Sequence, residues 1–120
     1  MQNLNQRTFN YAVAVGKLYD VLILNDRNKA YLNQLVRCSS SVGANYRAAQ
    51  RGKSSSDFLN KLKIVEEEAD ENIYFLELLL AFNPTHSTQL ESLINEGTEI
   101  LKIIVASIIT TRNNMQSPDK

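Results

Sequence analysis

The stretch that decides the fold runs from Leu35 to Phe58 and reads LVRCSSSVGANYRAAQRGKSSSDF. It begins with apolar residues at helical spacing, continues through a run of small residues and breaks at Gly52. Glycine commonly ends a helix, and Ser54 followed by Asp57 is a capping pattern that starts a new one. The stretch therefore predicts the end of one long helix, a short polar turn and the start of another.

Two further polar breaks divide the chain, at Asn25–Asn28 and at Asn83–Ser87, where Pro84 cannot continue the preceding helix. The breaks leave four segments of helical length, about 4–24, 29–52, 55–82 and 87–113. Because short connections favour antiparallel neighbours, we predict an all-α, up-down-up-down antiparallel four-helix bundle over residues 1–113. Residues 114–120 are expected to form a frayed tail.

Composition points to one domain in a reducing compartment. The chain has 120 residues, which is enough for a core without disulfides or metals. Its single cysteine, Cys38, lies among helix residues, which favours a buried thiol and a cytoplasmic location. The first residues show no signal-peptide pattern, and no apolar run approaches the roughly 20 residues of a membrane span. We therefore expect a cytoplasmic protein with no membrane contact.

Charge is segregated along the chain although the net charge is zero. Residues 1–63 hold ten of the thirteen Lys and Arg and three of the thirteen Asp and Glu, so this half carries +7 and the rest carries −7. The basic residues of the first half could pair with the acidic residues of the second half inside the bundle. The alternative is a basic face that remains free for an acidic partner such as nucleic acid.

Three of the predicted helices carry apolar residues on two faces. A helix of a monomeric bundle needs one apolar stripe, so the second stripes predict contact with another copy of the chain. The candidate interface residues are Tyr11, Val15, Leu18 and Leu22 in the first helix, Ile64, Phe75, Leu78 and Phe82 in the third, and Ile103 in the fourth. Periodicity does not decide which stripe is core and which is interface.

The second helix differs because small residues thin its apolar face. Ser39 and Gly43, four residues apart, would let a neighbouring helix approach closely. On the adjoining side lie Arg37, Arg47 and Arg51, with the small residues Ser40 and Ala44 between them. Lys53 follows in the turn, and we call the four basic residues the basic strip. This strip could contact the phosphates of RNA or DNA. It could instead pair with carboxylates of the next helix, namely Glu66, Asp70 or Glu77.

The sequence does not support a catalytic or metal-binding function. Gly52-Lys53-Ser54 resembles part of a phosphate loop, but the position of its first glycine holds Arg47 and no strand precedes it. The chain has one histidine, His86, in a predicted loop, so bundle metal sites of the Glu-x-x-His type are excluded. One histidine and one cysteine also make a nucleophilic catalytic set improbable. We expect a non-enzymatic protein without metal or cofactor.

Three motifs resemble a known family. They are Ser41-Val42-Gly43-Ala44-Asn45-Tyr46-Arg47-Ala48-Ala49-Gln50, then Ser56-Asp57-Phe58-Leu59-Asn60-Lys61, then Glu67-Glu68-Ala69-Asp70-Glu71 with Tyr74-Phe75-Leu76-Glu77-Leu78. From about Leu4 to Ile109 the chain resembles the small bacterial four-helix-bundle proteins named after intervening sequences of 23S rRNA. Many members continue the Ser-Val-x-x-Asn core as Asn-Ile-Ala-Glu-Gly, whereas this chain has Asn45-Tyr46-Arg47-Ala48-Ala49.

The resemblance implies a ring-like homopentamer of four-helix subunits. A related branch comprises the accessory variability proteins of diversity-generating retroelements, which are basic pentamers that bind nucleic acid and a reverse transcriptase. This chain differs from that branch because its net charge is zero. From the resemblance and the basic strip, we expect a homopentameric interaction scaffold that binds RNA or DNA through that strip. The alternative is a protein-only adaptor that docks a partner protein and has its basic half neutralised internally.

Overall fold

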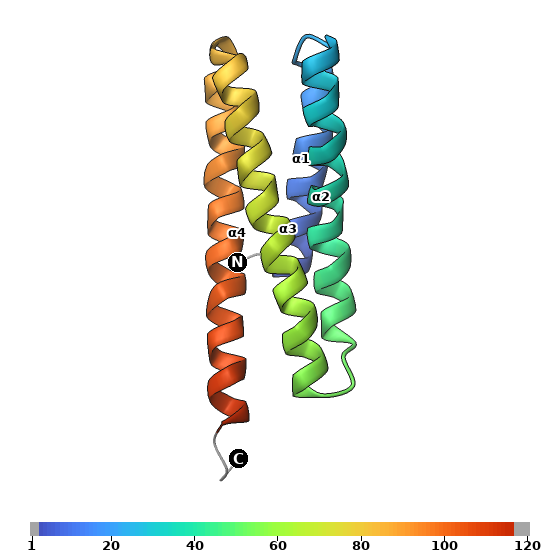
Figure 1. The fold of residues 1–120 in the computed structure, drawn as a ribbon, viewed down its shortest axis with the longest axis vertical. Helices are drawn as coiled ribbons and strands as arrows, with labels where there is room; N and C mark the ends of the chain where they lie inside the picture. Colours follow the sequence, from blue (N-terminus) through green and yellow to red (C-terminus); the bar gives the residue numbers. More distant parts are fainter. Residues whose placement is uncertain (1–2, 117–120) are drawn as a thin grey trace.

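The computed structural model describes residues 3–116, which fold into four long α-helices and two short 3-10 helices and contain no strand (Figure 1). The elements are α1 (Leu4–Gly16), η1 (Lys17–Asp20), α2 (Asp26–Gln50), α3 (Ser55–Phe82), η2 (Pro84–His86) and α4 (Ser87–Met115). Consecutive helices lie side by side and are joined by short connections, and α1 also lies against α4. The result is an elongated helical bundle of 56 × 24 × 20 Å.

Side-chain caps begin three of the four helices. The side chain of Asn3 accepts a hydrogen bond from the Gln6 amide at 2.8 Å, and that of Asn25 accepts one from the Asn28 amide at 2.8 Å. The Ser54 hydroxyl accepts one from the Asp57 amide at 3.1 Å, in the capping arrangement that the sequence predicts. Each cap satisfies a backbone N–H that has no partner within its helix.

The first helical segment is shorter than the predicted 4–24. The α-helix ends at Gly16, the chain tightens into η1, and residues 21–25 are not helical. Glycine is a poor helix former, and a tightened 3-10 turn is a common end for an α-helix. As a result α1 has 13 residues whereas α3 has 28.

The other boundaries lie close to the predicted ones. Because Asn25 caps α2, this helix starts at Asp26 rather than at residue 29. The third helix spans 55–82, as predicted, and α4 runs two residues past the predicted 113. Asn114 and Met115 are thus helical, whereas residues 117–120 of the predicted frayed tail lie outside the described residues.

The core consists of one apolar stripe from each helix. Its largest fully buried side chains include Val15, Leu32, Leu35, Val42, Leu62, Val65, Leu76, Leu79, Leu90, Ile100 and Ile104. Cys38 is also fully buried, as predicted. Among the described residues, no helix is both long and apolar enough to cross a membrane.

The interface prediction is wrong for the first helix. Tyr11, Val15, Leu18 and Leu22 are at most 4% exposed and pack into the core of their own chain, so they cannot contact a second copy. The opposite stripe faces outward instead: Phe9 is 60% exposed and Val13 is 43% exposed. Two apolar stripes give equal periodicity, so the choice between them depends on packing against α2 and α4.

Two glycines allow α1 to pack closely against its neighbours. A Cβ added to Gly43 would lie 3.2 Å from the Thr8 hydroxyl oxygen, which confirms the close approach predicted at this point of α2. A Cβ added to Gly97 of α4 would lie only 2.8 Å from the Tyr11 hydroxyl oxygen. On the α4 side, Arg7 also donates two hydrogen bonds to the Glu96 carboxylate, at 2.7 and 2.9 Å.

Candidate interaction surfaces

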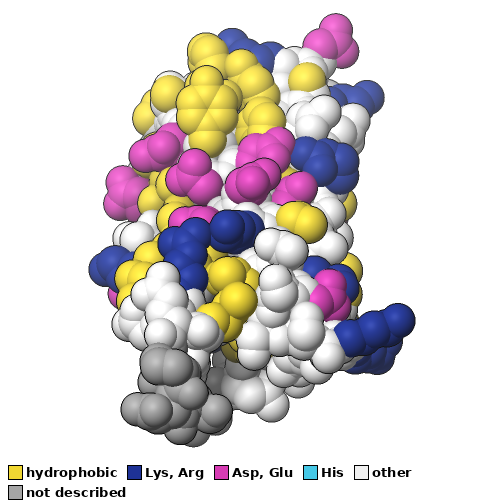
Figure 2. Space-filling model, turned by 60° about the horizontal axis from the view of Figure 1, so that its bottom comes forward, with side chains coloured by type: hydrophobic (Ala, Val, Ile, Leu, Met, Phe, Trp, Pro, Cys, Tyr) yellow, Lys and Arg dark blue, Asp and Glu magenta, His cyan; other side chains and the backbone are white. Residues whose placement is uncertain are grey.

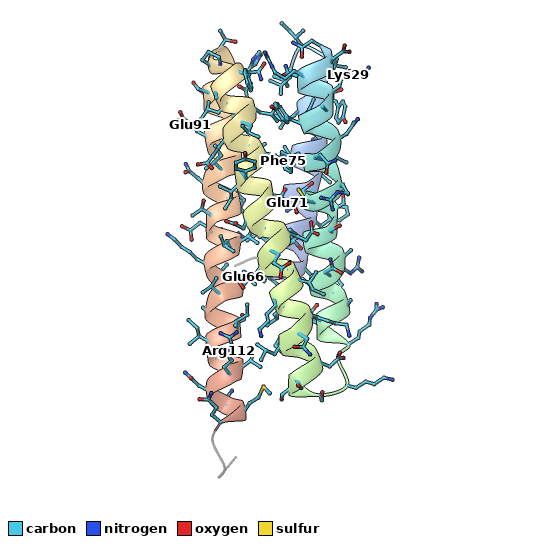
Figure 3. All side chains as sticks on the ribbon, in the orientation of Figure 1. Lys29, Glu66, Glu71, Phe75, Glu91 and Arg112 are labelled. Carbon is cyan, nitrogen blue, oxygen red and sulfur yellow. The ribbon has the colours of Figure 1, made fainter. Side chains whose placement is uncertain are left out.

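The structure divides the basic strip into a paired and an unpaired part. Arg37 donates a hydrogen bond to Glu71 at 2.9 Å, and its other terminal nitrogen lies 3.6 Å from Glu68 in a looser ion pair. Glu71 lies where α3 meets α2 (Figure 3). The internal pairing considered for the strip is therefore present at Arg37, but its partners are not Glu66, Asp70 or Glu77.

Arg47, Arg51 and Lys53 differ from Arg37 because they have no ionic partner. All three are exposed, and among residues 3–116 none has a carboxylate oxygen within 4.0 Å. The nearby carboxylate of Asp57 is already occupied, because it accepts two hydrogen bonds from Lys61 and one from the backbone of Lys53. The turn between α2 and α3 thus forms a free basic end of the bundle, defined here as Arg47, Arg51 and Lys53.

A groove of about 640 Å³ lies between the start of α1 and the second half of α2, next to this basic end. Small residues of α2, among them Ser40, Gly43 and Ala44, line it, together with the exposed ring of Phe9 on α1. Arg47 is the single charged side chain among the described residues that line the groove. The groove therefore combines one aromatic ring, one cation and a narrow surface of small side chains.

Amide side chains supply the polar groups of the groove. The side-chain oxygen of Asn5 is buried and accepts no hydrogen bond from the described residues. The Gln6 side chain donates to Asn10 at 2.9 Å, which leaves its own oxygen available. The Asn5 oxygen is out of reach of a ligand in the groove, whereas the Gln6 oxygen can accept a hydrogen bond from an N–H group of a ligand.

An aromatic patch lies on the outer face shared by α2 and α3, and is defined here as Tyr31, Tyr74, Phe75 and Phe82. The ring of Tyr31 stacks on Phe82 with centroids 6.0 Å apart and lies 6.4 Å from Phe75, which in turn meets Tyr74 edge-on at 5.8 Å. The Arg27 guanidinium lies 4.0 Å from the centre of the Phe82 ring. Figure 2 shows hydrophobic side chains gathered at one end of this face beside a band of carboxylates.

The interface residues predicted in the later helices have positions compatible with that role. Ile64 is 47% exposed and Phe82 is 43% exposed, whereas Phe75, Leu78 and Ile103 are half-buried. Phe75 and Phe82 belong to the aromatic patch, and Phe75 lies beyond Glu71 along α3 in Figure 3. Contact with a second copy would bury this apolar area.

The interior holds titratable groups that are held in their neutral forms. Burial raises the pKa of the Cys38 thiol to about 11, with a further contribution from the Glu71 carboxylate. Burial also raises the pKa of Tyr11, whose hydroxyl has no hydrogen-bond partner among the described residues. A buried protonated thiol is a poor nucleophile. Within residues 3–116, no three His, Cys, Asp or Glu side chains gather as a metal site would require.

Sequence reasoning missed the residues that complete these surfaces. Phe9 belongs to a stripe that periodicity could not separate from the core stripe, and Tyr31 and Tyr74 carried no pattern of their own. What distinguishes these three aromatic residues is that each has, three or four positions away on the same helix, a neighbour whose side chain is more deeply buried. That contrast becomes visible only when the packing of the bundle is known.

Comparisons with known proteins agree with this fold. The family model of the 23S rRNA-intervening sequence proteins matches residues 2–106. The chain belongs to this family. It is also similar to the crystal structure of a protein of unknown function from the S23 ribosomal protein family of Bacteroides thetaiotaomicron. The two chains are 35% identical with a TM-score of 0.80, and the match covers 88% of this chain and 98% of that one. Among curated proteins, none matches this sequence.

Proposed function

We propose that this family member is a non-enzymatic cytoplasmic scaffold that self-associates and binds the phosphates of RNA or DNA through its free basic end. In this proposal each subunit is an up-down-up-down bundle, and five subunits form a ring-like homopentamer. The observation that carries the nucleic-acid part is the contrast between the middle of α2 and the region formed by its last turn and the turn that follows it. Arg37 has two carboxylate neighbours, whereas Arg47, Arg51 and Lys53 have none within 4.0 Å among the described residues.

Unpaired cations are the groups that phosphate binding requires. Neutralising phosphates with Lys and Arg releases counterions, and this term supplies most of the sequence-independent affinity for nucleic acid. Arg47 lies in the last turn of α2, and Arg51 is the residue that caps the C-terminal end of this helix. A ring would repeat this basic end in every subunit, so weak contacts would add through multivalency.

Self-association is supported by apolar side chains that the fold leaves outside the core. Ile64, Phe75, Leu78 and Phe82 recur along one face of α3, and Tyr31 of α2 extends that face. Aromatic residues and arginine are enriched in protein interfaces. Mass-calibrated light scattering at micromolar concentration should give five subunits. A monomer at micromolar concentration would contradict self-association, and a dimer would contradict only the predicted number of five subunits.

The nucleic-acid part is tested by comparing two double variants of α2. Arg47→Gln with Arg51→Gln should abolish retention of RNA and DNA oligonucleotides at low salt and should leave the free energy of unfolding within about 0.5 kcal/mol of wild type. The matched control is Lys29→Gln with Arg37→Gln, which removes the same two charges nearer the other end of the helix. The control should retain nucleic acid as the wild type does.

Two outcomes would contradict the proposal. Wild-type protein that retains neither single-stranded nor duplex oligonucleotides at low salt would eliminate the nucleic-acid part. Equal loss in the two double variants would mean that net charge, and not the basic end, determines retention.

The second candidate function is a protein-only adaptor, and the aromatic patch is the observation that favours it. Its rings lie partly exposed on one face, and Arg27 covers Phe82, as in many protein interfaces. Absence of nucleic-acid binding by a protein that still self-associates would favour this candidate.

A further inference from the structure

We propose that the groove between α1 and α2 binds an unpaired base of a single-stranded nucleic acid, with the base on the ring of Phe9 and the adjoining phosphate on Arg47. This inference rests on the proposed nucleic-acid function and adds the class of strand and the place where it binds. Phosphate contacts carry no sequence information and form with single-stranded and duplex nucleic acid, so the basic end alone does not select unpaired bases.

The exposed aromatic ring is the first argument. Phe9 is 60% exposed and borders the groove, although a phenylalanine on a helix of a small bundle normally contributes to the core. Proteins that bind single strands combine a cationic groove with aromatic side chains on which bases stack. Bases in a duplex are already stacked on one another, so a ring of this kind selects for unpaired bases.

The charge of the groove is the second argument. Arg47 is the single charged side chain among its described lining residues, and Arg51, at the C-terminal cap of α2, has no carboxylate partner in the described residues. A strand whose base rests on Phe9 can therefore place its phosphates along α2 without meeting a carboxylate in the groove. The aromatic patch offers no such path, because carboxylates lie beside it (Figure 2).

The polar groups and the size of the groove are the third argument. Gln6 is exposed and lines the groove, so its side-chain oxygen can accept a hydrogen bond from the exocyclic amino or ring N–H groups of a base. The small side chains of Ser40, Gly43 and Ala44 leave a volume of about 640 Å³. This lies within the range of roughly 300–1,000 Å³ that is typical of small-molecule pockets, so a nucleotide fits.

A tryptophan reporter tests the stacking directly. The chain contains no tryptophan, so Phe9→Trp places a single fluorophore at the groove. Its emission should be quenched, with saturation, by a single-stranded RNA of about twelve nucleotides, and should be little changed by the matching duplex. Adding Ala44→Leu fills the groove from an exposed position of α2 and should remove the quenching.

Affinity measurements supply the second readout. Phe9→Ala should weaken single-strand binding about 5- to 140-fold for one lost stacked base and leave duplex binding unchanged. Ile109→Ala is the matched control, because Ile109 is 52% exposed but lies outside both the groove and the aromatic patch. It should leave both affinities unchanged.

The failures of the two proposals can be told apart. If Phe9→Ala binds the single strand as wild type does while Arg47→Gln with Arg51→Gln abolishes binding, the groove inference is wrong and the proposed function stands. If Phe9→Ala changes the mass of the assembly, the groove is a contact between copies and the inference is again wrong. If wild-type protein binds no oligonucleotide, the proposed function itself fails.

Discussion

The middle and the end of this bundle use the same helix for different purposes. In the middle, α1 covers α2, Arg37 is paired with Glu68 and Glu71, and small residues admit close packing. At the end formed by the α2–α3 turn, Arg47 and Arg51 have no carboxylate within 4.0 Å among the described residues. A charged side chain is therefore paired where the neighbouring helix has a residue of opposite charge beside it. Where the neighbouring helix has none, the side chain is free to bind a ligand.

The largest effect is expected from Tyr11 in the middle of the bundle. Its ring is 3% exposed, so Tyr11→Ala should lower the free energy of unfolding by about 3–5 kcal/mol, as for other buried aromatic residues. Phe9→Ala, on the outer face of the same helix, should change it by less than about 0.5 kcal/mol. Urea denaturation of both variants checks this, and equal losses would mean that both faces of α1 are core.

A smaller effect is expected where α1 approaches α2. Gly43→Leu places a side chain against Thr8 and should cost about 1–3 kcal/mol from overpacking, partly offset by about 1 kcal/mol because glycine is a poor helix former. The adjacent Ala44→Leu, at an exposed position, should be nearly neutral. Thermal unfolding of the two variants tests whether α1 packs closely on α2 at Gly43. A Gly43→Leu melting temperature at or above that of the wild type would contradict close packing.

The smallest effect concerns the end of the bundle and depends on pH. Hydrogen bonds from Lys61 and from the backbone of Lys53 lower the pKa of Asp57 below its ordinary value. A lowered carboxyl pKa stabilises the folded state above the unfolded pKa of about 3.9, and this contribution is lost as pH falls through the lowered value. Asp57→Asn should therefore melt below wild type at pH 7, and the difference should narrow below about pH 4. A constant difference across that range would show that the charge of Asp57 is irrelevant.

Much of the fold was accessible from the sequence, because its signals are local. The capping pattern at Ser54 and Asp57, the break at Pro84 and the small residue Gly43 each act through neighbouring backbone or through one helix contact. Periodicity does not distinguish two apolar stripes on the same helix, so it does not identify the core stripe. The sequence predicts the core stripe of α1 to be an interface because Tyr11 and Phe9 lie on faces of similar apolarity, and only packing separates the two faces.

The candidate site was predictable in part for the same reason. Periodicity grouped Arg37 with Arg47 and Arg51, since it reports the side of a helix. It does not report which residues of α3 lie opposite, and the pairing of Arg37 with Glu68 and Glu71 depends on the register of two helices. The groove and the ring of Phe9 depend in addition on where α1 begins relative to α2.

The salt dependence of binding to single-stranded RNA tests the central claim most directly. The logarithm of the association constant should fall linearly with the logarithm of salt concentration, with a slope of roughly 0.7 for each phosphate neutralised. Arg47→Gln with Arg51→Gln should reduce the magnitude of that slope by about 1.4, and Lys29→Gln with Arg37→Gln should leave it unchanged. Identical slopes for the wild type and both double variants would contradict the claim that the unpaired end of α2 is the part that contacts nucleic acid.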